Sequence, residues 1–283
     1  MKNILLPTDF SENAWNAIDY AVNLFKDDEC TFYLLNTYTP VLYDTEYILY
    51  SPTHISMEEI YKINSQKGLD KVEKRLLREY ANPKHSIEKI SAFNLLTDEL
   101  QQQVKERKIE LIIMGTQGAT GADQILFGSN TVHAIKRVNC LLLAIPSNYT
   151  FKPVNNILFP TDFNIAFTNK QLALIKQIAT VFESKIHMLH VFFGNELTAV
   201  QEHNKKDLVH QFKLQSHKFH SVAKKSVPQA IYNFQEENDV DMLAMINNRH
   251  SFFENILFRP VINEIGFHVK CPFLVIPSGE HKH

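Results

Sequence analysis

Short apolar runs alternate with amphipathic stretches along the whole chain, a pattern typical of a parallel sheet with crossover helices. In the first half, the predicted strands are Asn3–Leu6, Thr31–Asn36, Ser86–Ser91, Leu111–Met114 and Leu141–Ile145. The helices there are expected to begin after Asp9, to run over 57–80 and 97–107, and to follow Gly128-Ser129. In the second half, strands are predicted over 156–159, 185–191, 242–246 and 273–276, and helices up to Phe182, across Thr198–Ala223, over Val227–Asn238 and after Pro260.

The first predicted helix has both a start signal and a buried face. Ser11 stands where a helix N-cap is expected, and its hydroxyl can accept a bond from a free N–H of the first turn. The apolar positions that follow recur at helical spacing: Ala14, Ala17, Ile18, Ala21, Val22 and Phe25. We therefore expect this face to lie against the sheet.

An internal repeat divides the chain into two copies of one domain. Residues 3–10 read Asn-Ile-Leu-Leu-Pro-Thr-Asp-Phe, and residues 156–163 read Asn-Ile-Leu-Phe-Pro-Thr-Asp-Phe. The ends also correspond, since Cys140 and Cys271 each precede an apolar run that finishes Ile-Pro-Ser. About 140 residues per copy is enough to bury a core, so we predict two domains, 1–147 and 154–283, joined by a short polar linker.

Only the first copy keeps a cluster of glycines. It reads Met114-Gly115-Thr116-Gln117-Gly118, then nine residues, then Gly128-Ser129-Asn130-Thr131. The corresponding places in the second copy are Ile246, Arg249, Arg259 and Pro260. Glycines let the backbone approach a ligand closely, and the N-terminus of the following helix favours anions. This segment therefore predicts a phosphate site in the first copy, although any single glycine would indicate no more than a turn.

The carboxyl ends of the first and fourth strands are where a ligand should bind. In a sheet of strand order 3-2-1-4-5 the winding reverses between these strands, and the crevice lies there. The loops that meet are Pro7-Thr8-Asp9 and the segment 115–129. Asp9 can accept hydrogen bonds from a ribose hydroxyl or an amine, or it can cap the first helix. Its counterpart Asp162 occurs in the copy without glycines, which favours capping in part, and the two roles are compatible.

With these motifs the chain resembles the universal stress protein family in its tandem two-domain form. The family pattern Gly-x2-Gly-x9-Gly-Ser/Thr is matched without a gap, and the early aspartate is matched by Asp9. The resemblance implies two Rossmann-like α/β domains, each a five-stranded parallel sheet of order 3-2-1-4-5 flanked by helices. It also implies binding of ATP or AMP, with Mg²⁺ as an optional companion. The implied nucleotide-binding residues are Pro7, Thr8, Asp9, Thr37, Met114, Gly115, Gln117, Gly118, Gly128, Ser129, Asn130 and Thr131.

Such proteins commonly pair through their last strand, here Leu141–Ile145 or Phe273–Ile276. The resemblance thus implies pairing of the two domains within one chain, and a homodimer as a further assembly.

In the second copy, Arg249 and Arg259 fill space that phosphates would need. Loss of the ligand is the favoured interpretation there. Binding of a different anion by these arginines and His250, or of an apolar metabolite, is the alternative.

Composition excludes several classes of function. A net charge of −2 with scattered basic residues argues against a nucleic-acid binder. No run of 18 apolar residues predicts a membrane span, and the apolar start is too short for a signal sequence. Three cysteines suit a reducing compartment, and we expect them to be buried and unpaired. The expected location is the cytoplasm.

Two further features have alternative interpretations. The loop between Tyr38 and Ser56 carries four tyrosines, which favours packing against the other copy over capping of the ligand site. His203, His210, His217 and His220 are expected on one helix, where only His217 and His220 could share a metal ion. A solvated or interface stripe is favoured over a metal site.

Catalytic signatures are absent from the sequence. There is no Gly-Lys-Ser/Thr P-loop, no evident Ser-His-Asp or Cys-His order, and no lysine in the glycine segment. The first hypothesis is a nucleotide-binding protein whose ligand regulates assembly or partner choice. The alternative is an enzyme, at most a slow ATPase or an adenylyl-handling activity that uses the same pocket.

Overall fold

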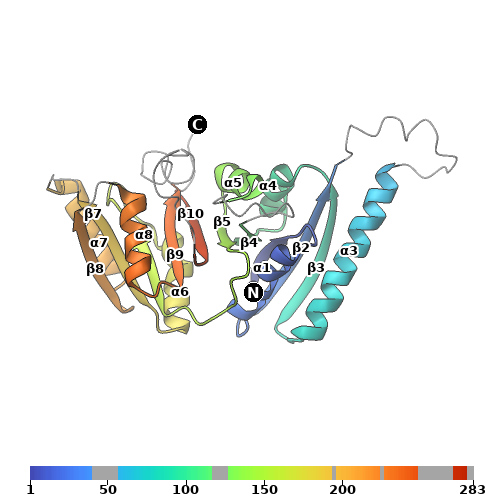
Figure 1. The fold of residues 1–283 in the computed structure, drawn as a ribbon, viewed down its shortest axis with the longest axis horizontal. Coiled ribbons are helices and arrows are strands. Elements are labelled where there is room, and N and C mark those ends of the chain that lie inside the picture. The colour runs from blue at the N-terminus through green and yellow to red at the C-terminus, as the bar shows by residue number, and fades with distance from the viewer. Residues whose placement is uncertain (40–56, 117–126, 193–195, 224–225, 248–269, 279–283) are drawn as a thin grey trace. The chain divides into compact units, whose positions relative to one another are not determined.

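The computed structural model describes residues 1–39, 57–116, 127–192, 196–223, 226–247 and 270–278. By contacts the chain forms two compact units (Figure 1). Unit 1 holds the described residues up to Thr116 together with 128–140, and unit 2 holds Phe127 and the described residues from Leu141 onward. The domain boundaries 1–147 and 154–283 remain predictions, as do the pairing of the two repeats and a homodimer.

Unit 1 is a parallel sheet of order β3-β2-β1-β4. Its strands are β1 (Lys2–Pro7), β2 (Cys30–Tyr38), β3 (His85–Phe93) and β4 (Leu111–Gly115). Its helices are α1 (Glu12–Leu24), α3 (Met57–Glu79), α4 (Leu96–Glu106) and α5 (Ser129–Arg137). The four strands, α3 and α4 were predicted to within two residues at either end, whereas for α1 and α5 only the start was predicted.

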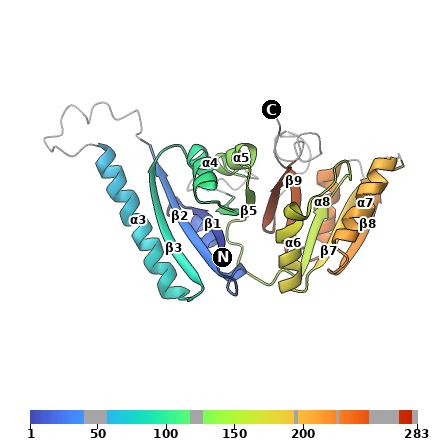
Figure 2. The same cartoon turned by 180° about the vertical axis from the view of Figure 1, so that it is seen from behind.

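The helices of unit 1 associate in two pairs. α1 and α3 are joined by Arg75, whose guanidinium lies 3.9 Å from the centre of the Trp15 ring and whose Nη1 donates to Glu12. α4 and α5 lie side by side in both views (Figures 1 and 2), and Gln101 Nε2 donates to the carbonyl of Arg137. Because right-handed crossovers change face where the winding reverses, the two pairs cover opposite faces of the sheet.

The start of α1 agrees with the sequence. Ser11 is the N-cap and its hydroxyl accepts a bond from the N–H of Ala14 at 3.2 Å. The predicted apolar face is buried throughout. This helix therefore fixes the direction in which the chain leaves β1, at the edge of the sheet where ligands are expected.

Unit 2 contains the rest of the strands and helices. Its strands are β5 (Leu141–Ile145), β6 (Asn156–Pro160), β7 (Lys185–Phe192), β8 (His217–Ala223), β9 (Met242–Asn247) and β10 (Phe273–Pro277). Its helices are α6 (Asn169–Val181), α7 (Ala199–Gln211) and α8 (Val227–Glu237). The second repeat runs β8-β7-β6-β9-β10, which is the predicted order 3-2-1-4-5, and β5 pairs antiparallel with β10. α8 lies in front of the sheet in Figure 1 and α6 in front of it in Figure 2, so the helices cover both faces.

The predicted helix across Thr198–Ala223 is wrong. α7 ends at Gln211, and the chain then turns and forms β8, which pairs with β7 along its whole length. A capping box of Thr198 and Gln201 starts α7, and the fully buried Phe212 ends it. The physical reason is that β7 has hydrogen-bonding groups to satisfy on its outer side, and a strand satisfies them where a longer helix could not.

The four histidines expected on one helix lie on two different elements. His203 and His210 lie on α7, whereas His217 and His220 lie on β8. Residues three apart in a strand point to opposite faces, so His217 and His220 cannot share an ion. Among the described residues, no three His, Cys, Asp or Glu side chains are arranged to hold a metal.

Two other expectations have partial answers. All three cysteines are buried, as predicted, and none of them forms a disulfide. No helix in the described part of the chain is long and apolar enough to cross a membrane. The aromatic loop beyond Tyr38 and the helix expected after Pro260 lie outside the described residues, as do Arg249, His250 and Arg259.

Candidate functional site

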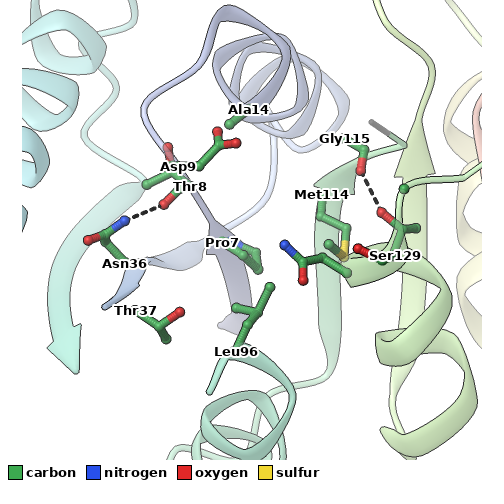
Figure 3. Close-up of a pocket in the computed structure, with 13 residues that line it drawn as sticks. Pro7, Thr8, Asp9, Ala14, Asn36, Thr37, Leu96, Met114, Gly115 and Ser129 are labelled. Carbon is green, nitrogen blue, oxygen red and sulfur yellow. Dashed lines mark hydrogen bonds between the residues drawn. The ribbon is translucent and has the colours of Figure 1, made fainter. Parts of the chain in front are cut away.

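A cavity of about 370 Å³ opens in unit 1 at the carboxyl ends of β1, β2 and β4, beside the start of α5 (Figure 3). This volume is within the range of small-molecule sites. It is lined by Pro7, Thr8, Asp9, Ala14, Asn36, Thr37, Leu96, Met114, Gly115, Gly128, Ser129, Asn130 and Thr131.

The cavity brings together ten of the twelve residues expected at a nucleotide site. The other two, Gln117 and Gly118, lie outside the described residues. Three lining residues were missed: Ala14, Asn36 and Leu96. Of these, Asn36 could have been found from the sequence, because it is a polar residue directly after the apolar run of β2. In the structure its side chain is buried.

The turn after β1 presents Asp9 to the cavity. Phe10 adopts a left-handed backbone conformation with φ of 66°, and its N–H donates to the hydroxyl of Thr8 at 3.0 Å. A carboxylate oxygen of Asp9 accepts bonds from the N–H and the hydroxyl of Ser11. A non-glycine residue at such φ is strained, so the turn depends on these side-chain bonds.

The second repeat contains the same turn. Phe163 has φ of 57° and donates to the hydroxyl of Thr161 at 3.1 Å, and Asp162 accepts from the N–H of Asn164 at 3.0 Å. The turn therefore forms without the glycine pattern. Its aspartate has a structural role in both repeats, and at Asp9 that role coexists with a place in the cavity wall.

A buried amide holds the turn against β2. Asn36 Nδ2 donates to the carbonyl of Thr8 at 2.8 Å (Figure 3). In the second repeat His190 takes the corresponding place and bonds the carbonyl of Thr161 through Nδ1 at 3.1 Å. Since both repeats tie this carbonyl to the second strand, Asn36 positions the cavity wall as well as lining it.

Gly115 at the end of β4 lies against α1. A Cβ atom there would be 2.4 Å from Asn13 Nδ2 and 3.2 Å from the Asn13 carbonyl oxygen. Its φ lies outside the left-handed region, so the backbone conformation alone does not require glycine here. Glycine is needed at Gly115 for space, which brings the end of β4 close to α1.

The start of α5 is joined to the end of β4 by two hydrogen bonds. The N–H of Gly128 donates to the carbonyl of Thr116 at 2.6 Å, and the hydroxyl of the buried Thr131 donates to the carbonyl of Gly115 at 2.9 Å. The first N–H groups of a helix have no partner within it, and Ser129, Asn130 and Thr131, which form the first turn of α5, line the cavity. This arrangement suits an anion such as a phosphate.

The charge of the lining is low. Asp9 is the only ionised side chain among the thirteen lining residues. Ala14, Leu96 and Met114 supply apolar surface, while Thr8, Thr37 and Ser129 supply hydroxyls. The cavity thus combines an apolar part with a helix N-terminus, and attraction for an anion comes from backbone N–H groups and the helix dipole.

Comparisons with known proteins decide the family. The model of the universal stress protein family matches residues 1–146, which is more than half of the chain. The chain belongs to the universal stress protein family. A universal stress protein of Methanocaldococcus jannaschii is 30% identical over 149 residues, covering 51% of this chain and 81% of that relative.

Solved structures of universal stress proteins have the same fold over the whole chain. One from Archaeoglobus fulgidus has a TM-score of 0.69 at 17% identity, and each chain is covered to 98%. A structure described as a putative universal stress protein from Pseudomonas aeruginosa has a TM-score of 0.59 at 10% identity, covering 98% of this chain and 93% of the other. This universal stress protein therefore has the tandem form, with two Rossmann-like repeats.

Proposed function

We propose that the first repeat binds an adenine nucleotide, ATP or AMP, and that its occupancy regulates assembly or the choice of partner. One observation carries the proposal: the Pro7–Asp9 turn, Thr37, the end of β4 and the start of α5 line a single cavity. The cytoplasm is the proposed location, since three cysteines without a disulfide suit a reducing compartment.

The geometry supports a nucleotide for two reasons. Gly115 lets the end of β4 lie close to α1, and its carbonyl accepts the Thr131 hydroxyl at the start of α5, a helix N-terminus that favours phosphate. The apolar side chains of Leu96 and Met114 offer a surface on which a base can lie, with Asp9 and Thr37 as hydrogen-bonding partners. The described residues of the same wall include no lysine or arginine, which favours retention of a nucleotide over phosphoryl transfer.

A denaturing extraction of the purified protein, followed by mass spectrometry, tests the proposal directly. We expect adenine nucleotide in the extract, or saturable binding of added ATP or AMP if the ligand is lost on purification. A protein that carries no nucleotide and shows no heat on titration with either compound would contradict the proposal.

We predict one nucleotide per chain. Gly115 of the first repeat corresponds to Ile246 in the second, which lies within β9 and carries a branched side chain where the first repeat needs the space of a glycine. Titration calorimetry with ATP should give a stoichiometry near one. A stoichiometry of two sites per chain would show that the second repeat retains a working site.

Thr131→Val should lower nucleotide affinity about tenfold, because a buried hydrogen bond that holds the start of α5 is worth about 1–3 kcal/mol when its acceptor is left unpaired. Thr131→Ser keeps the hydroxyl and should restore most of the affinity. Both variants can be compared by calorimetry with AMP and with ATP.

Ser184→Ala is the matched control. The hydroxyl of Ser184 donates to the carbonyl of Val154, so it is also a buried bond from a side chain to the backbone, but it lies in unit 2. We expect it to lower the melting temperature and leave the affinity unchanged. Equal losses of affinity in Thr131→Val and Ser184→Ala would mean that Thr131 has no special part in positioning the site.

A further inference from the structure

Two histidines of the second repeat form a hydrogen-bonded pair. His187 Nδ1 on β7 and His220 Nε2 on β8 are 3.0 Å apart, with ring centroids 5.2 Å apart and planes 29° from parallel. His187 Nε2 is in turn 3.0 Å from Asn156 Oδ1 on β6. The Phe234 ring of α8 meets both imidazoles edge to face, and His187 is only 8% exposed.

The partners fix where the protons lie. An amide oxygen only accepts, so Asn156 requires the proton of neutral His187 on Nε2. His187 Nδ1 is then an acceptor, and His220 must donate to it through Nε2–H. The neutral pair therefore forms one directed chain of hydrogen bonds from β8 through β7 to β6.

We propose that His187 and His220 form a proton-sensitive lock in the second repeat: the neutral pair joins β6, β7 and β8, and acidification breaks that join. The proposal goes beyond nucleotide binding, because every residue in it lies in unit 2.

The two protonation steps differ. The first proton can enter at His220 Nδ1, since that imidazolium still donates through Nε2–H to His187. The second must enter at His187 Nδ1, toward which the hydrogen of His220 already points. That step breaks the bond between the rings and places two cations side by side.

The surroundings oppose the charged forms. Asn156 of β6 is neutral and Phe234 of α8 is apolar, while the charges that act on both rings are those of Lys185 on β7 and Lys218 on β8. Burial, followed by the charges of His220 and the two lysines, lowers the pKa of His187 to about 4. Burial and the same lysines also lower the pKa of His220.

The direction of the effect on stability follows from these shifts. Both pKa values are lower in the folded chain than in the unfolded chain, so unfolding takes up protons in acid. The stability contributed by the neutral pair is present above the ordinary histidine pKa of 6.5 and is lost as the pH falls from there toward about 4.

The geometry disfavours a metal ion at the pair. A separation of 5.2 Å between the ring centroids fits two imidazoles that are joined by one N–H···N hydrogen bond. An ion such as Zn²⁺ binds each imidazole nitrogen at about 2.0–2.1 Å. His187 Nδ1 and His220 Nε2 point at each other across only 3.0 Å, so no ion fits on the line between them. Addition of Zn²⁺ should therefore leave the melting temperature unchanged, and a saturable rise that His187→Phe abolishes would overturn the proposal.

Thermal melting at pH 7.5 and pH 5.0 tests the lock. The double variant His187→Phe/His220→Phe keeps aromatic rings against Phe234 and removes the titrating groups. We expect the melting temperature of the unmodified chain to fall by at least about 5 °C over this range, and the variant to lose at least half of that fall. An equal fall in both proteins would overturn the proposal.

His203→Gln/His210→Gln is the control, because these histidines are exposed on α7 in the same repeat. It should keep the full pH dependence, and a loss equal to that of the double variant would overturn the assignment to the pair.

If the double variant fails to fold, the imidazole resonances of the intact chain, followed by NMR against pH, test the lock instead. His187 should titrate only below about pH 5 and shift together with His220, whereas two independent titrations near pH 6.5 would overturn the lock.

Discussion

Gly115→Val is expected to lower the affinity for adenine nucleotide by about thirtyfold or more, roughly 2 kcal/mol, in a chain that still folds. A Cβ at this position would lie 2.4 Å from Asn13 Nδ2 and 3.2 Å from the Asn13 carbonyl oxygen. The amide end of Asn13 can move, but the backbone carbonyl cannot move without shifting α1. The end of β4 would therefore move away from α1.

This movement should reach the start of α5. The Gly115 carbonyl accepts the hydroxyl of Thr131, and the Thr116 carbonyl accepts the N–H of Gly128. Displacing both carbonyls moves the helix N-terminus that faces the cavity. Calorimetric titration with AMP and ATP measures the loss, and far-ultraviolet circular dichroism checks that the fold remains.

Ile246→Val is the matched control, since Ile246 holds the place of Gly115 in the second repeat and is buried in β9. It removes one methylene from a packed strand, which should cost about 0.5–1.5 kcal/mol of stability and leave nucleotide affinity unchanged. If Gly115→Val retained its affinity within about threefold, close approach of the backbone at Gly115 would have no part in binding.

The sequence predicted the elements well where local signals and burial agree. The repeated Pro-Thr-Asp-Phe located the end of the first strand in each repeat, and Ser11 with an apolar face at helical spacing located α1. β8 was missed because its residues, His217 to Ala223, are mostly half-buried or exposed and carry little apolar signal. Its strand conformation is imposed by pairing with β7, which is not visible in the local sequence.

Most residues that line the cavity were among those predicted from the sequence, but the contacts between them were not. The glycine pattern located Gly115 and Gly128, yet the reason for glycine at Gly115 is the approach of Asn13, which is distant in the sequence. Asn36 was missed because its bond to Thr8 crosses from one strand to the next. The left-handed conformation of Phe10 was also missed, since it depends on side-chain bonds within the turn.

Withdrawal of Mg²⁺ is expected to weaken ATP binding at least tenfold and to change AMP binding less than about threefold. Among the described residues that line the cavity, Asp9 is the only one with an ionisable side chain, so they offer no cationic side chain to a triphosphate. Attraction comes from the N-terminus of α5, equivalent to about half of one positive charge. That attraction can offset a monophosphate in part but not the larger charge of a triphosphate.

Each phosphate charge left without a counter-ion near Asp9 costs on the order of 1 kcal/mol at separations of several ångströms in a partly hydrated site. A divalent cation on the triphosphate removes most of this repulsion, and the carboxylate of Asp9 can then act as an attractive partner for the ion. Calorimetric titrations of ATP and AMP, each with Mg²⁺ and with a chelator, measure the difference. Equally tight binding of ATP with and without Mg²⁺ would contradict this account, because it would require cationic groups that the described wall of the cavity does not contain.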